Sequence, residues 1–313
     1  MMAFIKNWML PLAMLAGALG YFVYAGIPAL DSTHQMANRT IAVVQPLLLF
    51  AMLFLTFCKV RPADLRLARW QAGVLLFQVL TFLLGTLLVR LMPDSHWSVV
   101  IEAGMLCLIC PTATAAAVVT RKLGGRAGTL TAYTILVNIA VAIIIPLTVP
   151  LLHPHPEHAF LHSFLTIMSR VFPLLLGPFL LSVLLRWWSP RTTEWISQVR
   201  DLPFYLWAVS LSLAIAVSTK SIVHSHVPWG YQLAIAAISL VTCIVQFALG
   251  RYLGRKYDDP ISAAQACGQK NTVFAIWLGY TFLTPVTSIA GGFYSIWHNL
   301  WNSYQLYRVK GEG

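Results

Sequence analysis

Polar residues interrupt an apolar stretch near the end of the chain. In SAAQACGQKNTVFAIW, Gly268 is followed by Gln269, Lys270 and Asn271. Charged and amide side chains in the middle of such a stretch persist only where protein groups or a water-filled cavity satisfy them. An ionisable residue in that setting is typical of a binding or coupling site, so Lys270 is the first candidate functional residue. The alternative is a lysine that is solvated in a cavity and purely structural.

A second apolar stretch is interrupted by proline. GMLCLICPTATAAAVVT carries Pro111 at its middle, and proline removes a backbone donor and clashes with the preceding helical turn. We therefore predict two broken helices, whose second halves start near Thr112 and Asn271. Each such N-terminus presents free N–H groups and a partial positive charge, which suits an anionic ligand. Two kinks without a ligand are the alternative.

The composition indicates that these segments lie in a membrane. Of the 313 residues, 58% are hydrophobic and only 10% are charged, whereas soluble domains carry about 25% charged residues. The net charge of +11 does not indicate a nucleic-acid partner, because Lys and Arg lie in short clusters between apolar runs. Cys107 and Cys110 have CxxC spacing inside an apolar run without a second pair, so we expect packing and no metal site.

Ten apolar stretches divide the chain, which we expect to form a single all-α integral membrane domain over residues 1–313. A helix that crosses a bilayer needs about 20 apolar residues. The stretches are 8–30, 40–58, 70–91, 97–120, 128–152, 160–188, 202–219, 229–253, 261–282 and 285–306. The two interruptions fall in the fourth and ninth stretches, the fourth place of each set of five. Broken helices at matching places indicate two inverted five-helix repeats with a binding site at the membrane midplane.

The distribution of Lys and Arg predicts the orientation. With both termini in the cytoplasm, most of the 21 basic residues lie on the inner side, as the positive-inside rule requires. The outer ones would be Arg39, Arg90, Arg170 and Lys220. This bias supports the helix count and the orientation. No Arg/Ser-rich transit segment precedes the first helix, so we expect a multi-pass protein of the plasma (inner) membrane. The run from Trp8 to Tyr24 exceeds the apolar core of a signal peptide, about 7–15 residues, so we expect a retained first helix.

Three motifs on these segments carry a resemblance to a known family. Residues 110–115 read Cys-Pro-Thr-Ala-Thr-Ala, Gly268–Asn271 has the pattern Gly-x-x-Asn, and residues 294–299 read Tyr-Ser-Ile-Trp-His-Asn. Together with Pro173 and Gly177 in VFPLLLGPFLL, they resemble the bile acid:sodium symporter family of secondary transporters. The resemblance covers nearly the whole chain and marks it as a divergent member.

The resemblance implies a panel that moves against a core. The panel would be helices 8–30, 40–58, 160–188 and 202–219, and the core helices 70–91, 97–120, 128–152, 229–253, 261–282 and 285–306, with the fourth and ninth helices crossing. It implies alternating-access transport of organic anions, such as bile acids or small hydroxy and keto acids. By position, the substrate contacts would include Thr114, Asn271, His298 and Asn299.

The sequence departs from that family where sodium would bind. Ala116 and Ala117 stand where the family has a Ser-Asn pair, and Ala266 stands where it has a glutamate. A site that has lost these oxygen ligands and gained the ammonium of Lys270 should not bind sodium. Lys270 replaces the family's glutamine, whereas Gln78 still matches its place and Thr134 persists as a former ligand. The candidate coupling or ion-site residues are therefore Lys270, Gln78, Gln269 and Thr134.

Lys270 is expected to occupy the place of the ion, bonded to Gln78 and to unwound backbone carbonyls. If Lys270 titrates during the cycle, the carrier would be proton-coupled. If it stays charged, the carrier would be a sodium-independent uniporter or exchanger, and direct pairing with the substrate carboxylate is a third possibility. We expect no cofactor, while the substrate's identity, the direction of transport and the oligomeric state stay open.

Three other functions compete with a carrier of organic anions. A cation–proton antiporter-like carrier would place carboxylates at the crossing, where the sequence has none. A membrane-embedded enzyme would need a catalytic cluster, and no HExxH, GxSxG or P-loop pattern occurs. A non-transporting membrane sensor is left open.

Glu102 and a histidine-rich segment are two further ionisable features of the apolar regions and their loops. Glu102, in the outer half of stretch 97–120, is expected near the water boundary, with a proton relay as the alternative. The segment 153–162, HPHPEHAFLH, carries four histidines. We expect an exposed loop there rather than a metal site.

Overall fold

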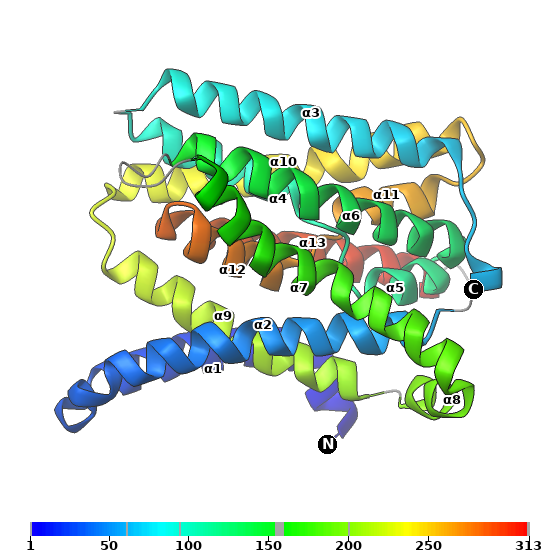
Figure 1. Cartoon of the computed structure of the whole chain (residues 1–313), viewed down its shortest axis with the longest axis horizontal. Helices are drawn as coiled ribbons and strands as arrows, with labels where there is room; N and C mark the ends of the chain where they lie inside the picture. Colours follow the sequence, from blue (N-terminus) through cyan, green and yellow to red (C-terminus); the bar gives the residue numbers. More distant parts are fainter. Residues whose placement is uncertain (1, 61, 94, 154–159, 200, 312–313) are drawn as a thin grey trace.

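The computed structural model describes residues 2–60, 62–93, 95–153, 160–199 and 201–311. In these ranges the regular structure is helical apart from one isolated backbone bridge. Figure 1 shows the helices in roughly parallel and antiparallel rows, with α3 along one edge and α1 and α2 along the other. By length and composition, 7 helices in the described part of the chain are able to cross a membrane. They are α1 (Met2–Ala25), α2 (His34–Cys58), α3 (Arg69–Leu91), α6 (Ala127–Leu152), α7 (Phe160–Trp188), α9 (Leu202–Val223) and α10 (Trp229–Arg255).

Two of the expected membrane stretches are each divided into two helices. Stretch 97–120 consists of α4 (Trp97–Ile109) and α5 (Ala116–Lys122), and stretch 261–282 consists of α11 (Pro260–Gly268) and α12 (Thr272–Phe282). The breaks at Pro111 and at residues 269–271 are therefore confirmed. The chain then continues through the short helix η3 (Pro285–Thr287) into α13 (Ser288–Gly311).

Short helices between the long ones were not expected from the sequence. They are η1 (Pro28–Thr33), η2 (Pro62–Asp64) and α8 (Pro190–Gln198). The first long helix ends at Ala25 and the second begins at His34, so the boundary at residues 30–40 differs from the expected one. Proline at the start of η1 and α8 explains both starts, because its fixed φ suits the first helical turn.

The helices pack in two groups. In the first, α1 packs against α9, and α2 packs against α7 and α9. In the second, α10 packs against α4, α11 and α13. Helix α3 also packs against α4, and helix α12 packs against α13. Helix α6 lies between them and contacts both α7 and α3. The first group contains the helices that the resemblance assigns to a panel; movement of one group against the other stays a prediction.

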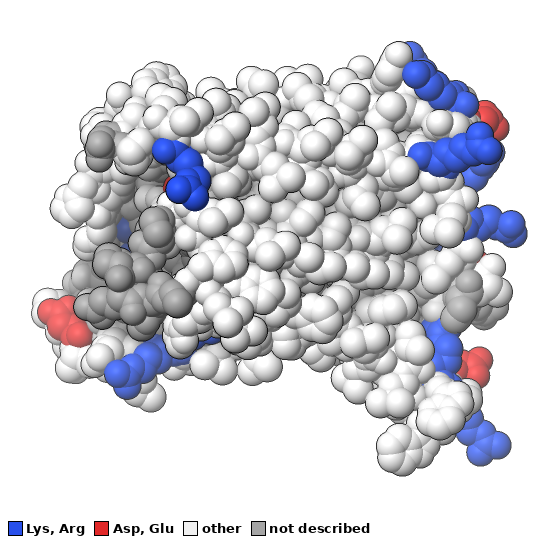
Figure 2. Space-filling model, turned by 45° about the horizontal axis from the view of Figure 1, so that its top comes forward, with Lys and Arg blue, Asp and Glu red and all other residues white. Residues whose placement is uncertain are grey.

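Charge gathers at the two ends of the molecule. Figure 2 shows Lys and Arg mainly at one end, with a broad middle surface that carries almost no charge on this face. We call that end the basic end; α2, α5 and α10 end there, and α3 and α6 begin there. Its described basic residues include Lys59, Arg66, Arg69, Arg121, Lys122, Arg126, Arg255 and Lys256. Many large apolar side chains are exposed on the middle surface, among them Leu80, Leu84 and Leu87 of α3, as expected for a lipid-facing protein.

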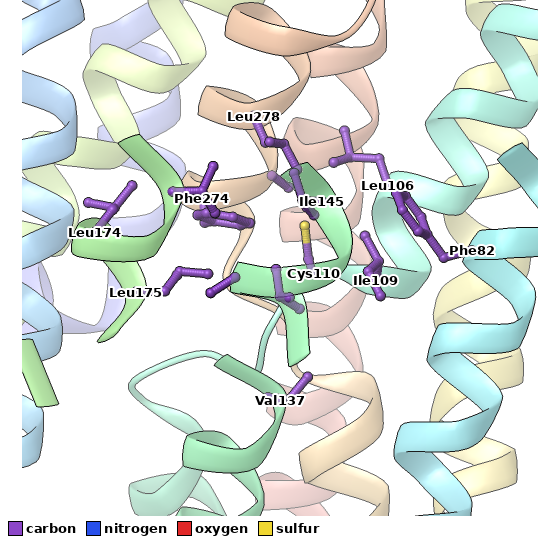
Figure 3. Close-up of a cluster of buried hydrophobic side chains, with 14 of the residues drawn as sticks. Phe82, Leu106, Ile109, Cys110, Val137, Ile145, Leu174, Leu175, Phe274 and Leu278 are labelled. Carbon is purple, nitrogen blue, oxygen red and sulfur yellow. The ribbon is translucent and has the colours of Figure 1, made fainter. Parts of the chain in front are cut away.

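Buried apolar side chains enclose the two breaks. Figure 3 shows Cys110, at the end of α4, lying among Ile109, Ile145 and Leu278, with Phe274 of α12 nearby. All five cysteines are free and buried. Close packing of apolar groups leaves little room for water, so the polar groups at the breaks must find partners within the protein.

Candidate functional site

The two unwound segments pair with each other inside the bundle. Ala113 N donates to Gln269 O at 2.8 Å, and Asn271 N donates to Pro111 O at 2.8 Å. Because each segment satisfies backbone groups of the other, non-helical chain is tolerated in this buried region. The pairing fixes the end of α4 next to the end of α11.

Side chains cap the last carbonyl groups of α4. A helix C-terminus leaves its last carbonyls without helical partners and carries a partial negative charge. Leu108 O accepts from Lys270 Nζ at 3.0 Å, and Cys107 O accepts from Gln246 Nε2 at 3.2 Å. Lys270 is only 1% exposed. Its ammonium is therefore buried at the negative end of α4, which stabilises the charge.

The last carbonyls of α11 are capped in the same way. Ala266 O accepts from Thr112 Oγ1 at 2.8 Å, and Gly268 O accepts from Tyr294 OH at 2.8 Å. The same hydroxyl accepts from Gln246 Nε2 at 2.9 Å. Gln246 of α10 thus supports both breaks.

Gln78 belongs to this network, but not as predicted. Its Nε2 donates to Gln246 Oε1 at 3.5 Å, and its Oε1 accepts from Tyr133 OH at 2.6 Å. The expected hydrogen bond between Lys270 and Gln78 is wrong, since none joins them among the described residues. The ammonium lies instead at the carbonyl of Leu108, where the dipole of α4 adds negative charge that a neutral amide oxygen lacks.

The four predicted substrate contacts lie around one small cavity beside the paired segments. Its lining includes Thr114, Asn271, His298 and Asn299, together with Gln269, Lys270, Met52 of α2 and Trp207 of α9. The cavity has a volume of about 40 Å³, which is space for a few water molecules or a small polar group. The structure brings these residues together; their contact with a substrate stays a prediction.

Asn271 presents its amide nitrogen at the start of α12. It is the N-cap residue of α12, and its Oδ1 accepts from Phe274 N at 3.2 Å. A side-chain oxygen in this position satisfies one of the free N–H groups of the first turn. Since the oxygen is engaged in the cap, the NH₂ group is the part of the side chain left to act on a ligand.

His298 lies in the wall of the cavity, and its neighbour Asn299 fixes which ring nitrogen carries the proton. Asn299 Nδ2 donates to Ser295 O at 2.7 Å and lies 2.9 Å from His298 Nε2. A carbonyl only accepts, so the Asn299 amide is oriented with its nitrogen toward the ring, and Nε2 accepts the second proton. This assigns the ring proton to Nδ1. That atom is buried and has no hydrogen-bond partner among the described residues.

The remaining candidate ion-site residues, Gln269 and Thr134, do not share one site: only Gln269 lines the cavity. Gln269 lines the cavity, and its Oε1 is buried without a partner in the described part of the chain. Thr134 Oγ1 donates to Leu130 O of its own helix at 3.0 Å, and Thr134 is not among the residues that line the cavity. Ala116 begins α5 and is fully buried. A methyl group offers no oxygen to a cation at that position.

Glu102 does not lie at the water boundary. It is 1% exposed, with Oε1 at 3.0 Å from His153 Nε2 and Oε2 accepting from Thr284 N at 3.2 Å. A histidine and a free backbone N–H stand next to it, which explains how the carboxylate is tolerated away from water. Of the histidine-rich segment, His155 and His158 lie outside the described residues.

Sequence reasoning did not find Gln246 and Tyr133. Gln246 is the amide that supports both breaks, and Tyr133 holds Gln78 in place. A glutamine within the apolar stretch 229–253 was the available signal, because buried amides need partners at membrane depth. Tyr133 carried no such signal, since tyrosine is common in apolar segments.

Comparison of the sequence with known protein families gives a match over nearly the whole chain. The sequence model of the SBF-like CPA transporter family matches residues 7–306, and these residues include both broken helices and α13 up to Leu306. No curated protein matches the chain. The family is a transporter family related to bile acid:sodium symporters, so a transport function is supported at this general level. With a match over nearly its whole length, the chain belongs to the SBF-like CPA transporter family.

Proposed function

We propose that this protein is a secondary transporter of small organic anions that works by alternating access and is not coupled to sodium. The observation that carries the proposal is the hydrogen bond from the buried Lys270 ammonium to Leu108 O at 3.0 Å. A buried ammonium group thus stands between two broken helices, next to the cavity.

The chemistry of the cavity favours an anion. The N-terminus of α12 carries a partial positive charge. Asn271 and His298 offer N–H donors, and Lys270 lines the same cavity. Carboxylate groups accept charge-assisted hydrogen bonds from such donors. The cavity of about 40 Å³ has room for a single carboxylate group in this conformation.

The same geometry argues against sodium. The terminal carbonyls of Cys107, Leu108, Ala266 and Gly268 already accept hydrogen bonds from side chains. A cation would have to displace these donors and approach the Lys270 ammonium, and two like charges repel strongly at short distance in a low-dielectric interior. We infer that Lys270 supplies the positive charge that a bound ion would supply.

The layout proposed for transport has ten membrane spans. Seven are the long helices, two are the broken pairs α4–α5 and α11–α12, and the tenth is α13. We infer two inverted five-helix repeats, with the basic end in the cytoplasm by the positive-inside rule. Both termini would then be cytoplasmic, in a multi-pass protein of the plasma (inner) membrane.

A cation–proton antiporter-like carrier is the alternative from the same kind of fold. Such a carrier needs carboxylates at the crossing to bind its cation. Among the described residues, those that line the cavity include no Asp or Glu, so the anion carrier is the better supported proposal. Coupling to protons is compatible with the anion carrier and with the antiporter-like carrier.

Uptake of a panel of radiolabelled small carboxylates into proteoliposomes tests the proposal. His298→Phe should reduce uptake at least tenfold, because it removes the Nδ1–H donor while the side chain keeps a similar volume. A tenfold loss corresponds to about 1.4 kcal/mol, close to the contribution of one hydrogen bond to a charged group. The control is His96→Phe, since His96 is exposed and lies against Tyr231 instead. No uptake of any anion by the wild type would overturn the proposal and favour a non-transporting membrane sensor.

A further inference from the structure

We propose that Glu102 and His153 form a proton-binding site at the end of the molecule opposite the basic end, through which pH on that side controls the opening of the carrier. Nothing in the proposed anion cavity uses this pair. Its use in transport rests on the proposed function, but its binding of a proton and its effect on the structure do not.

The carboxylate of Glu102 joins three elements. It belongs to α4; Oε1 is 3.0 Å from Nε2 of His153, which follows the last residue of α6. Oε2 accepts at 3.2 Å from the backbone N of Thr284, between α12 and η3. One side chain thus ties the half of α4 before its break to the turn that follows α12, and both to the end of α6.

The two partners differ in their access to water. The side chain of Glu102 is 2% exposed, whereas that of His153 is 41% exposed. A proton from the medium therefore reaches the pair through the imidazole. The hydrogen bond to Glu102 raises the pKa of His153 above its ordinary value, with burial acting in the opposite direction and the charge of Glu102 adding to the rise.

Other titratable and charged groups stand on the elements packed nearby. They are Arg90 of α3, His96 before α4, Tyr231 of α10, Tyr280 of α12, His162 and Arg170 of α7, Lys220 of α9 and His224 after it. Lys220 donates to Asn38, and His224 is hydrogen-bonded to Tyr21. His96 and Tyr231 lie against each other with ring centroids 5.2 Å apart. Among the described residues, Arg90, Arg170 and Tyr280 make no hydrogen bond or ion pair to Glu102 or His153. His153 is thus the group whose protonation compensates the buried carboxylate.

The sign of the pH effect follows from the raised pKa of His153. The protonated His153–Glu102 pair stabilises the fold fully below the ordinary histidine pKa of about 6.5. This stabilisation is lost as the pH rises through the higher pKa that His153 has in the folded protein. Above that value a buried carboxylate is left with neutral partners, which is unfavourable. Acid on this side should therefore hold the ends of α4, α6 and α12 together, and alkaline medium should release them.

Thiol labelling measures the release directly and needs no substrate. Thr284→Cys places a thiol at the turn, while the native cysteines are all buried. The rate at which a membrane-impermeant maleimide labels this thiol should rise between pH 6 and pH 9. The rise should be several-fold larger in Thr284→Cys alone than in Thr284→Cys combined with His153→Gln. The control background is His96→Gln, because the ring of His96 lies against Tyr231 instead, and it should behave like the histidine-containing parent.

Thermal unfolding in detergent gives a second reading that does not depend on the cysteine. The unfolding temperature of the wild type should fall by a few degrees over the same pH range, and Glu102→Gln and His153→Gln should each flatten that dependence. The proposal would be overturned if labelling of Thr284→Cys had the same pH dependence with and without His153→Gln, and if unfolding of the wild type and of His153→Gln also depended equally on pH. A response of labelling without any anion uptake would leave this proton site standing and refute the proposed carrier function alone.

Discussion

Lys270 and Leu108 come from the two different broken helices, and the ammonium of one donates to the carbonyl of the other at 3.0 Å inside the protein. The lysine lies in the break between α11 and α12, and the leucine lies in the last turn of α4. The bond therefore links the two breaks electrostatically as well as through the backbone pairing beside them. It also occupies a carbonyl that a cation would otherwise need.

Substitution of Gly268 tests how closely the break is packed. A Cβ atom at this position would lie 2.4 Å from the ring of Phe247, so Gly268→Ala should destabilise the protein by about 1–3 kcal/mol through overpacking. Thermal unfolding in detergent measures the loss. The control is Gly20→Ala in α1, where a Cβ would meet nothing within 4 Å. Equal stability of the two variants would contradict the packing described at the break.

Asn271 has two roles that substitutions can separate. Asn271→Ala removes the N-cap of α12 and should cost about 1 kcal/mol of stability, together with anion binding. Asn271→Ser keeps an oxygen for the cap but loses the amide donor, so it should retain most of the stability and still lose binding. Unfolding temperature and uptake, measured on both variants, distinguish the roles. If the serine variant transports normally, the amide is not a substrate contact.

Asp259 at the basic end provides a test of a buried carboxylate that lies away from the cavity. Its Oδ2 accepts from Trp70 Nε1 at 3.0 Å and from Thr129 Oγ1 at 2.6 Å, which joins the α10–α11 turn to α3 and α6. Asp259→Asn should destabilise the protein by about 1–3 kcal/mol, because a charged acceptor is lost from two buried donors.

The neighbouring residue supplies the control. Asp258 is almost fully exposed and pairs with Arg126 on the surface, and asparagine tolerates its positive φ of 53°. Asp258→Asn should therefore change stability by less than about 1 kcal/mol. A larger effect at Asp258 than at Asp259 would contradict the proposed importance of the buried network.

Much of the helical framework could be predicted because the sequence signals were local. The stretch 160–188 matches α7 at both ends, since polar and proline-containing segments flank a long apolar run. Both breaks were also found, because proline and a Gly followed by polar residues disfavour helix wherever they occur. The structure places Thr114, Asn271, His298 and Asn299 around one cavity, as their motif positions suggested.

The partners of the buried polar groups could not be predicted in the same way. Lys270 was expected at Gln78, but its ammonium lies at Leu108 O; the choice depends on where the end of α4 lies in space. Glu102 was expected near water because it is only a few residues from the start of its stretch, yet the ends of α6 and α12 cover it. Neither result can be read from spacing along one helix, since both depend on contacts between segments far apart in the chain.

Uptake of a transported carboxylate with sodium replaced by choline tests the central claim most directly. The wild type should transport equally well in both media, and Lys270→Gln should abolish transport in both. Lys256→Gln is the matched control, because Lys256 lies at the basic end over the ring of Tyr252 and should transport normally. Loss of wild-type uptake in choline would contradict the account, since it would show that sodium binds despite the ammonium of Lys270.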